Sequence, residues 1–180
     1  MMIHWSRFNI YLFTIIVLAL ICGCSSEASK RKKRVSTFRV QAETNADTTD
    51  RTEKIKIYRA QPFWMTVEKR PFVDERYVKE AKVVDVLGGY ALQIQFDRQG
   101  SWLLEQYTSA LRGKHIAIFS QFCAPPDDKL NQGRWLAAPL IQTRITDGLL
   151  VFTPDASREE AEEIALGLNN VAKKNGTADE

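Results

Sequence analysis

Cysteine and histidine are scarce in this chain of 180 residues, which has three cysteines and two histidines. Neither His4 nor His115 has a second histidine or a cysteine at the spacing that metal ligands use, so no metal or cofactor is expected. Once an export signal is cleaved and Cys24 is lipidated, Cys123 is the one remaining thiol, and a single thiol forms no internal disulfide. The scarcity of cysteine and histidine therefore excludes a zinc-binding domain and a domain stabilised by disulfide bonds.

The common catalytic motifs are also missing. There is no Walker loop, no dinucleotide-binding glycine pattern and no G-x-S-x-G nucleophile. Cys123 has no neighbouring base, and the adjacent Asp127 and Asp128 do not face a common substrate on a loop. We therefore expect a protein that is not an enzyme. The alternative is an envelope hydrolase or small-ligand protein on the same fold, which needs a concave site with titratable groups of perturbed pKa.

The basic charge of the chain is concentrated near its N-terminus. Six of the 25 basic residues are Arg7 and Lys30–Arg34, which leaves 19 Lys and Arg against 21 Asp and Glu from Val35 onward. A nucleic-acid surface needs a concentrated basic face. The nearly neutral remainder of the chain predicts no nucleic-acid partner.

The N-terminal segment predicts export. Arg7 precedes an apolar run from Ile10 to Ile21, which is shorter than the roughly 20 residues that a membrane-spanning helix needs. The run ends in Ile21-Cys22-Gly23-Cys24, which resembles a bacterial lipobox. Residues 1–23 are thus expected to be a lipoprotein signal peptide, with Cys24 lipidated and the protein held in the cell envelope, facing the periplasm or the exterior.

An uncleaved signal anchor is the alternative for this segment. The basic run Lys30–Arg34 follows the apolar run and outnumbers Arg7, so the positive-inside tendency favours a cytoplasmic body. If Cys24 is acylated, the same run lies beside an anionic leaflet, where each basic residue adds about 1 kcal/mol to attachment.

Composition divides the rest of the chain into three parts. Residues 24–53 are polar and predict a disordered tether, residues 54–175 predict the folded domain, and residues 176–180 predict a disordered tail. The alternation in EKIKIYRA predicts the first strand of the domain, and Gly88-Gly89 predicts the turn of a hairpin. Further strands are expected at HIAIFSQF, RWLAAPLI and GLLVF.

Two main helices are expected to pack on this sheet. SWLLEQYTSALRGK has one apolar stripe, and Ser157 with Glu160 forms a capping box before an apolar stripe that continues to Ala172. DERYVKEA predicts a short additional helix. The pattern favours an α+β two-layer sandwich with an antiparallel or mixed sheet and a ferredoxin-like tendency.

One long loop is the candidate contact surface. About eleven residues, Cys123–Gly133, separate two predicted strands, whereas hairpin loops usually have about two to five. The loop contains Pro125 and Pro126, and its bulky flanks are Phe122 and Trp135. Core packing is the alternative role for Trp135. We hypothesise that these four residues bind a partner.

Several short motifs follow one another between the first predicted main helix and the start of the second. Their residues are Gly100, Thr108, Gly113, Lys114, Ala117, Ile118, Ala137, Ala138, Pro139, Ile145, Gly148, Phe152, Thr153, Glu160 and Ala161.

These motifs, in this order, resemble the head subdomain of the first periplasmic domain of the protein-export components SecD and SecF. The resemblance spans roughly residues 55–172 and implies the fold of that subdomain. It also implies binding of an extended polypeptide or a translocon component. The membrane-embedded charges that drive the SecD/SecF machine are not part of this head subdomain. The long loop departs from the family, which has a tight turn there.

The sequence therefore favours a non-catalytic, lipid-anchored envelope protein with a protein partner. An accessory role in protein export is the function that the resemblance implies.

Overall fold

Strands make up most of the fold in the computed structural model, which describes residues 31, 34–46, 50–123 and 130–176. The α+β class is confirmed, because the described residues form two α-helices and strands that make up three sheets. In chain order the elements are β1 (Thr37–Ala42), β2 (Thr52–Ile57), β3 (Phe63–Glu68), β4 (Val73–Asp74), the 3-10 helix η1 (Glu75–Tyr77), β5 (Val78–Val86), β6 (Gly89–Phe96), α3 (Arg98–Ala110), β7 (Ile116–Cys123), β8 (Leu130–Ala137), β9 (Leu149–Phe152) and α4 (Arg158–Asn175).

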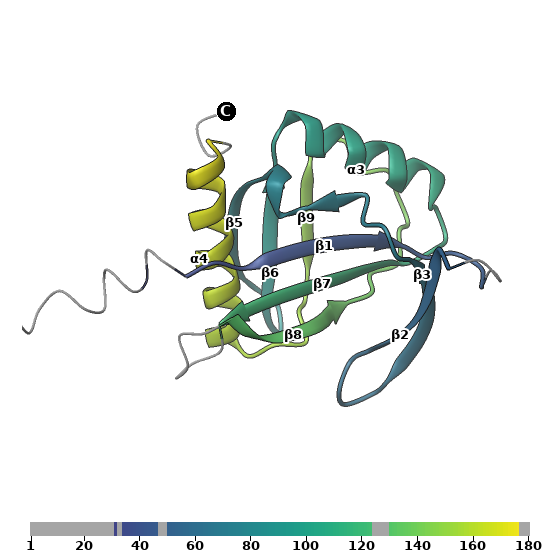
Figure 1. Cartoon of the computed structure of the whole chain (residues 1–180), viewed down its shortest axis with the longest axis horizontal. Coiled ribbons are helices and arrows are strands. Elements are labelled where there is room, and N and C mark those ends of the chain that lie inside the picture. The colour runs from purple at the N-terminus through teal and green to yellow at the C-terminus, as the bar shows by residue number, and fades with distance from the viewer. Residues whose placement is uncertain (1–30, 32–33, 47–49, 124–129, 177–180) are drawn as a thin grey trace, which may run out of the picture. The chain divides into compact units, whose positions relative to one another are not determined.

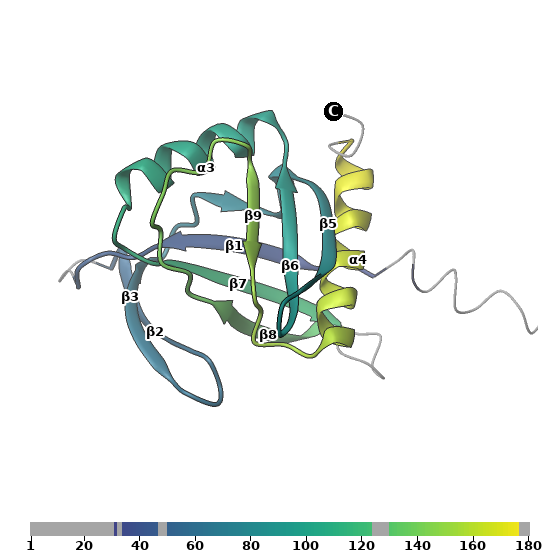
Figure 2. The same cartoon turned by 180° about the vertical axis from the view of Figure 1, so that it is seen from behind.

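Every pairing among the described strands is antiparallel. The first sheet has the order β4-β1-β7-β8, the second has the order β5-β6-β9, and β2 with β3 forms a separate hairpin. The strands of the first two sheets run across one another, α3 lies across one end of them, and α4 lies along β5 (Figures 1 and 2). The part of the chain from Arg34 onward forms one compact unit by itself.

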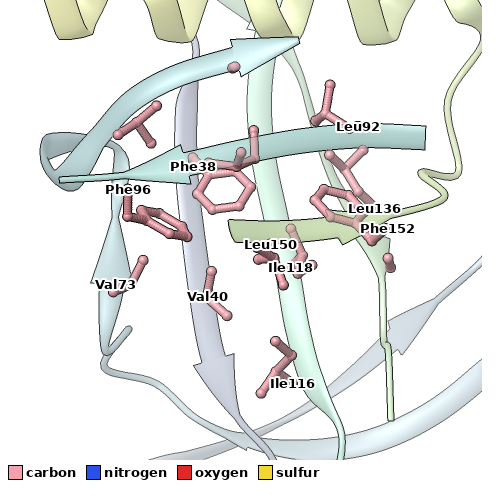
Figure 3. Close-up of a cluster of buried hydrophobic side chains, with 14 of the residues drawn as sticks. Phe38, Val40, Val73, Leu92, Phe96, Ile116, Ile118, Leu136, Leu150 and Phe152 are labelled. Atoms are coloured by element: carbon pink, nitrogen blue, oxygen red, sulfur yellow. The ribbon is translucent and has the colours of Figure 1, made fainter. Parts of the chain in front are cut away.

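The main core lies between the first two sheets, α3 and α4 (Figure 3). Alternate residues of each strand face it, because successive side chains of a strand point to opposite sides. Phe38 and Val40 of β1 meet Leu92 and Phe96 of β6 and Phe152 of β9. Full burial of such a side chain contributes about 1.5–3 kcal/mol. This core therefore supplies most of the stability.

A second, smaller apolar cluster lies on the opposite face of the first sheet. It consists of buried side chains from the β2–β3 hairpin and from the sheet beneath it, and Tyr58 and Trp135 pack against it. We call this set the hairpin cluster. Its buried members are Ile55, Ile57, Met65, Val67, Ala117 and Ala138.

Strand β1 corrects the predicted tether of residues 24–53. It pairs with β4 and β7, and Phe38 and Val40 are fully buried. The segment before β1 also packs on α4, where Ser36 lies against Gly167 at a distance that leaves no room for a Cβ. The strand has only three inward apolar residues between polar neighbours, so composition averaged over the segment concealed it. Residues 1–23 and Cys24, the predicted export signal and lipidation site, lie outside the described residues, as do residues 177–180 of the predicted tail.

Other predicted elements are confirmed or shifted. The hairpin at Gly88-Gly89 is confirmed, although only Gly88 has a positive φ, of 88°. Both main helices are confirmed, and α4 begins with the predicted capping box of Ser157 and Glu160. The short helix at DERYVKEA is wrong: η1 has only three residues, after which the chain enters β5.

Candidate functional site

A cleft of about 420 Å³ lies beside Trp135, between the end of the β2–β3 hairpin and strand β8. Three separate segments form it, so it exists only in the folded protein. The residues that line it are Lys56, Tyr58, Arg59, Gly133, Arg134, Trp135 and Asp155.

Trp135 belongs both to the hairpin cluster and to the wall of the cleft. Its ring meets the edge of the Phe119 ring, with centroids 5.2 Å apart, and packs against the hairpin cluster. The side chain is half-buried. The two roles that the sequence left open for Trp135, packing and contact with a ligand, are therefore compatible in this position.

Tyr58 supplies the second aromatic wall. It is the one non-glycine residue in the described part of the chain with a positive φ, 64°. L residues rarely adopt this conformation, so another interaction has to compensate for it. The Tyr58 hydroxyl accepts a hydrogen bond from the backbone N–H of Ala138 at 3.0 Å. This bond fixes the end of the hairpin to the sheet and keeps the tyrosine at the cleft.

Two arginine–carboxylate pairs form the polar side of the cleft. The Arg59 backbone N–H donates to Asp155 Oδ2 at 2.9 Å, and its guanidinium lies 3.2 Å from Oδ1. The Arg134 guanidinium donates to Glu160 at 2.6 Å and 3.1 Å and to the carbonyl of Asp155 at 3.3 Å. These bonds join the hairpin, β8 and the start of α4.

Both carboxyl groups are held in the ionised form. Burial alone raises the pKa of Asp155, but the hydrogen bonds and charge of Arg59 outweigh it and lower the pKa below its usual value. Burial likewise raises the pKa of Glu160, and the hydrogen bonds from Arg134 and from the Ser157 backbone outweigh it. Neither group is suited to donate or accept a proton near neutral pH. The polar side of the cleft is therefore formed by ionised, paired side chains.

The structure separates the residues that the sequence grouped into one contact surface. Phe122 is fully buried in the main core, because even-numbered residues of β7 face that core. Trp135 lies on the other face of the sheet, opposite Phe119. Phe122 is thus not accessible to a partner, and this part of the hypothesis is wrong. Pro125 and Pro126 lie outside the described residues.

The predicted loop is also shorter than expected. Strand β8 begins at Leu130 rather than at Arg134, so residues 130–133 belong to the strand. Sequence reasoning missed Tyr58, Arg59 and Asp155, which come from distant segments. The strand alternation of β7 places Phe119 and Phe122 on opposite faces, and the pairing with β8 shows that Phe119 is the neighbour of Trp135.

His115 and Cys123, the residues that the sequence analysis considered for metal binding or catalysis, lie away from this cleft. No set of three His, Cys, Asp or Glu residues there is placed to hold a metal ion. His115 Nδ1 lies 3.0 Å from Glu43 Oε2, and the same oxygen accepts the backbone N–H of His115. Cys123 is buried. These are structural contacts within the sheet.

A larger hollow of about 540 Å³ lies between β4 and α3. Its aromatic wall is formed by Phe72 and Tyr107, whose rings stack on each other at 4.2 Å. At its rim Arg76 is paired with Asp74 at 2.7 Å. Trp135, which the sequence predicts as a contact residue, lines the cleft but not this hollow, so the cleft is the stronger candidate.

Comparisons with known proteins agree with this fold. The family model of the SecDF P1 head subdomain matches residues 48–172. A solved structure of a membrane component SecDF that enhances protein export is 20% identical, with a TM-score of 0.55, and the match covers 82% of this chain and 70% of that one. SecDF from Thermus thermophilus, a translocon-associated membrane protein, is 17% identical with a TM-score of 0.40. That match covers 91% of this chain and 34% of the Thermus protein.

Two further findings complete the comparison. No curated protein matches the chain. Within the described residues, none of the helices has the length and apolar character needed to span a membrane. Strand β1 precedes the range that the family model matches.

Proposed function

Because the chain belongs to the SecDF P1 head subdomain family, we propose that it is a cell-envelope protein that binds a protein partner in support of protein export. The protein is anchored by a lipid on Cys24 and catalyses no reaction. The partner is an exported polypeptide in extended form or a component of the translocon. The observation that carries the proposal is the cleft beside Trp135, which combines aromatic walls with paired, ionised groups.

The geometry of the cleft supports binding of an extended chain. Tyr58 and Trp135 offer aromatic surface, and aromatic residues are enriched where proteins bind each other. Gly133 exposes backbone between them. The Arg59 side chain is 64% exposed although it is paired with Asp155, so it can add a hydrogen bond to a passing backbone carbonyl.

Site-directed photo-crosslinking in intact cells tests the binding proposal. A photo-reactive phenylalanine replaces Arg59 at the cleft, and the same residue replaces Arg112, which is exposed beyond the end of α3, as the matched control. We expect exported chains or translocon components to be crosslinked from position 59 only, and to be lost when Trp135→Ala is added. The same products from both positions, or products that do not depend on Trp135, would show that the cleft is not the binding site.

Labelling with radioactive palmitate tests the anchor separately. The wild-type chain is expected to incorporate the label and to fractionate with membranes, and Cys24→Ala is expected to lose both properties. An unlabelled wild-type chain of full length in the membrane fraction would instead identify an uncleaved signal anchor.

A further inference from the structure

The outer face of the β2–β3 hairpin carries a large aromatic side chain that the core does not use. Trp64 of β3 is 57% exposed. Side chains along β3 point alternately to its two faces. Met65 and Val67 point into the hairpin cluster, whereas Trp64 points away from it. The inner face of the hairpin packs against the first sheet, and Tyr58 and Arg59 hold its turn in place. Trp64 is therefore presented on the outer face of the hairpin.

Two lysines accompany Trp64 on the same face. Lys56 is the cross-strand partner of Trp64, and Lys54 is the partner of Thr66. Their ammonium groups lie 5.9 Å and 5.5 Å from the centre of the indole ring. Glu68, the acidic residue of this face, lies two pairs away at the base of the hairpin, opposite Thr52. The charge around Trp64 is thus positive.

We propose that this face, which consists of Lys54, Lys56 and Trp64, rests on an anionic lipid surface. Tryptophan is enriched where a membrane meets water, because its ring is apolar and its N–H is polar. Lysine is attracted to anionic headgroups, whereas it is depleted in protein–protein interfaces. The combination of an exposed tryptophan with two lysines therefore favours a lipid surface over a protein as the occupant.

The inference rests on the proposed lipid anchor, because the anchor brings the head close to a membrane. Ten residues separate Cys24 from Arg34, a stretch that reaches at most about 35 Å when extended. From there β1 leads directly to the hairpin, since Glu43 forms a bridge with Val67 of β3. The six residues of β1 span about 20 Å, so the hairpin can reach the same surface as the anchor.

Co-sedimentation with vesicles tests the lipid surface without any contribution from the anchor. The chain from residue 24 onward carries Cys24→Ser, so that it receives no acyl group, and residues 30–33 are replaced by glutamine, so that the basic run does not itself bind the vesicles. It is mixed with vesicles of phosphatidylglycerol and phosphatidylethanolamine, or of phosphatidylcholine alone. We expect binding to the anionic vesicles only, and binding that weakens as salt is added.

Matched variants assign the binding to the hairpin. Trp64→Ala is expected to weaken it by about tenfold. Trp102→Ala is the control, since Trp102 is 56% exposed on α3, and it is expected to change nothing. The double variant Lys54→Gln/Lys56→Gln is expected to weaken binding by about 30-fold, since each basic residue contributes about fivefold. Lys173→Gln/Lys174→Gln removes the same charge from the end of α4 and is its control.

Three results would overturn the proposal. The first is equal binding to both kinds of vesicle, and the second is an equal effect of Trp64→Ala and Trp102→Ala. The third is unchanged vesicle binding by Trp64→Ala together with loss of a crosslinked protein in cells, which identifies a protein contact instead. Since the chain in the vesicle experiment has no lipid, the vesicle results do not depend on whether Cys24 is acylated, which the palmitate experiment decides.

Discussion

The two faces of the sheet β4-β1-β7-β8 differ in what covers them. One face meets β6, β9 and α4, and the side chains of Phe38, Ile118 and Phe122 on it are fully buried. The other face meets only the β2–β3 hairpin, which leaves Trp135 half-buried at the edge of a cleft. The same strands thus build a closed core on one side and an open site on the other.

The two faces therefore contribute differently to the stability of the fold. The main core contains 24 buried residues and the hairpin cluster contains six, so the loss of the hairpin exposes far less apolar surface. Segments with few buried contacts open at a lower free energy than the core does. The hairpin is therefore expected to open more readily than the core does.

Phe38→Ala is expected to have the largest effect, because Phe38 belongs to the closed face. It is fully buried between Phe96 and Phe152. Removal of a buried phenylalanine side chain typically lowers the free energy of unfolding by about 3–5 kcal/mol. Urea unfolding measures the loss, and Val35→Ala, at a side chain that is 42% exposed, is the control. A loss in Phe38→Ala as small as in the control would mean that β1 is not part of the core.

Met65→Ala tests the open face and is expected to cost less, about 2 kcal/mol, the low end for a buried methionine. Met65 is 5% exposed in the hairpin cluster, where the hairpin can settle toward the sheet. Native-state hydrogen exchange is expected to show faster exchange in β2 and β3 and unchanged exchange in β7. Faster exchange throughout β7 would show that both faces unfold together and would remove the distinction between them.

Gly167→Ala tests the contact between α4 and the segment just before β1, where the chain joins the closed face of the sheet. An alanine Cβ there would lie 2.6 Å from the backbone nitrogen of Ser36 and 2.2 Å from its Oγ. The displacement is expected to lower the free energy of unfolding by about 1–2 kcal/mol, even though alanine favours a helix. Ser36→Gly added to Gly167→Ala should recover only part of the loss, since the backbone contact persists. Full stability of Gly167→Ala would mean that this segment is not held against α4.

The fold could be predicted where local signals in the sequence were strong. The prediction failed where pairing between strands decided the secondary structure. The capping box of Ser157 and the turn at Gly88 are local, and both predicted elements are present. Strand β1 is short and lies among polar residues, so its central position depends on its pairing with β7. Likewise DERYVKEA has a helical composition but becomes mainly β5, because β6 offers a partner along its length.

The candidate site was predictable only at Trp135. Its bulk beside a proposed loop was visible in the sequence, whereas its partners Tyr58 and Asp155 lie about 80 and 20 residues away along the chain. The prediction that Phe122 contacts a partner was wrong, because the sequence does not show which face of the sheet a residue lies on until the register with β8 is known. Residues that are brought together only by the tertiary structure produce no recognisable spacing in the sequence.

Glu160 connects the two faces and is expected to give the smallest effect, which depends on pH. It accepts hydrogen bonds from Arg134 on the cleft side and from the backbone of Ser157 at the start of α4. Burial raises its pKa, but these bonds outweigh burial and lower it below the 4.5 of the unfolded chain. The folded form therefore favours the ionised carboxylate, and this stabilisation is complete above pH 4.5 and is lost as the pH falls through the lower folded value.

Glu160→Gln is accordingly expected to lower the free energy of unfolding at neutral pH by about 1 kcal/mol. It is also expected to flatten the decline of stability below pH 4.5, because the variant has no proton to take up at this position. Urea unfolding over a series of pH values measures both, and Glu162→Gln on the same helix controls for the lost charge. An unchanged acid-side slope would mean that Arg134 does not stabilise Glu160 in the folded state. Arg59 and Arg134 would then join the cleft to the start of α4 only through their hydrogen bonds to Asp155.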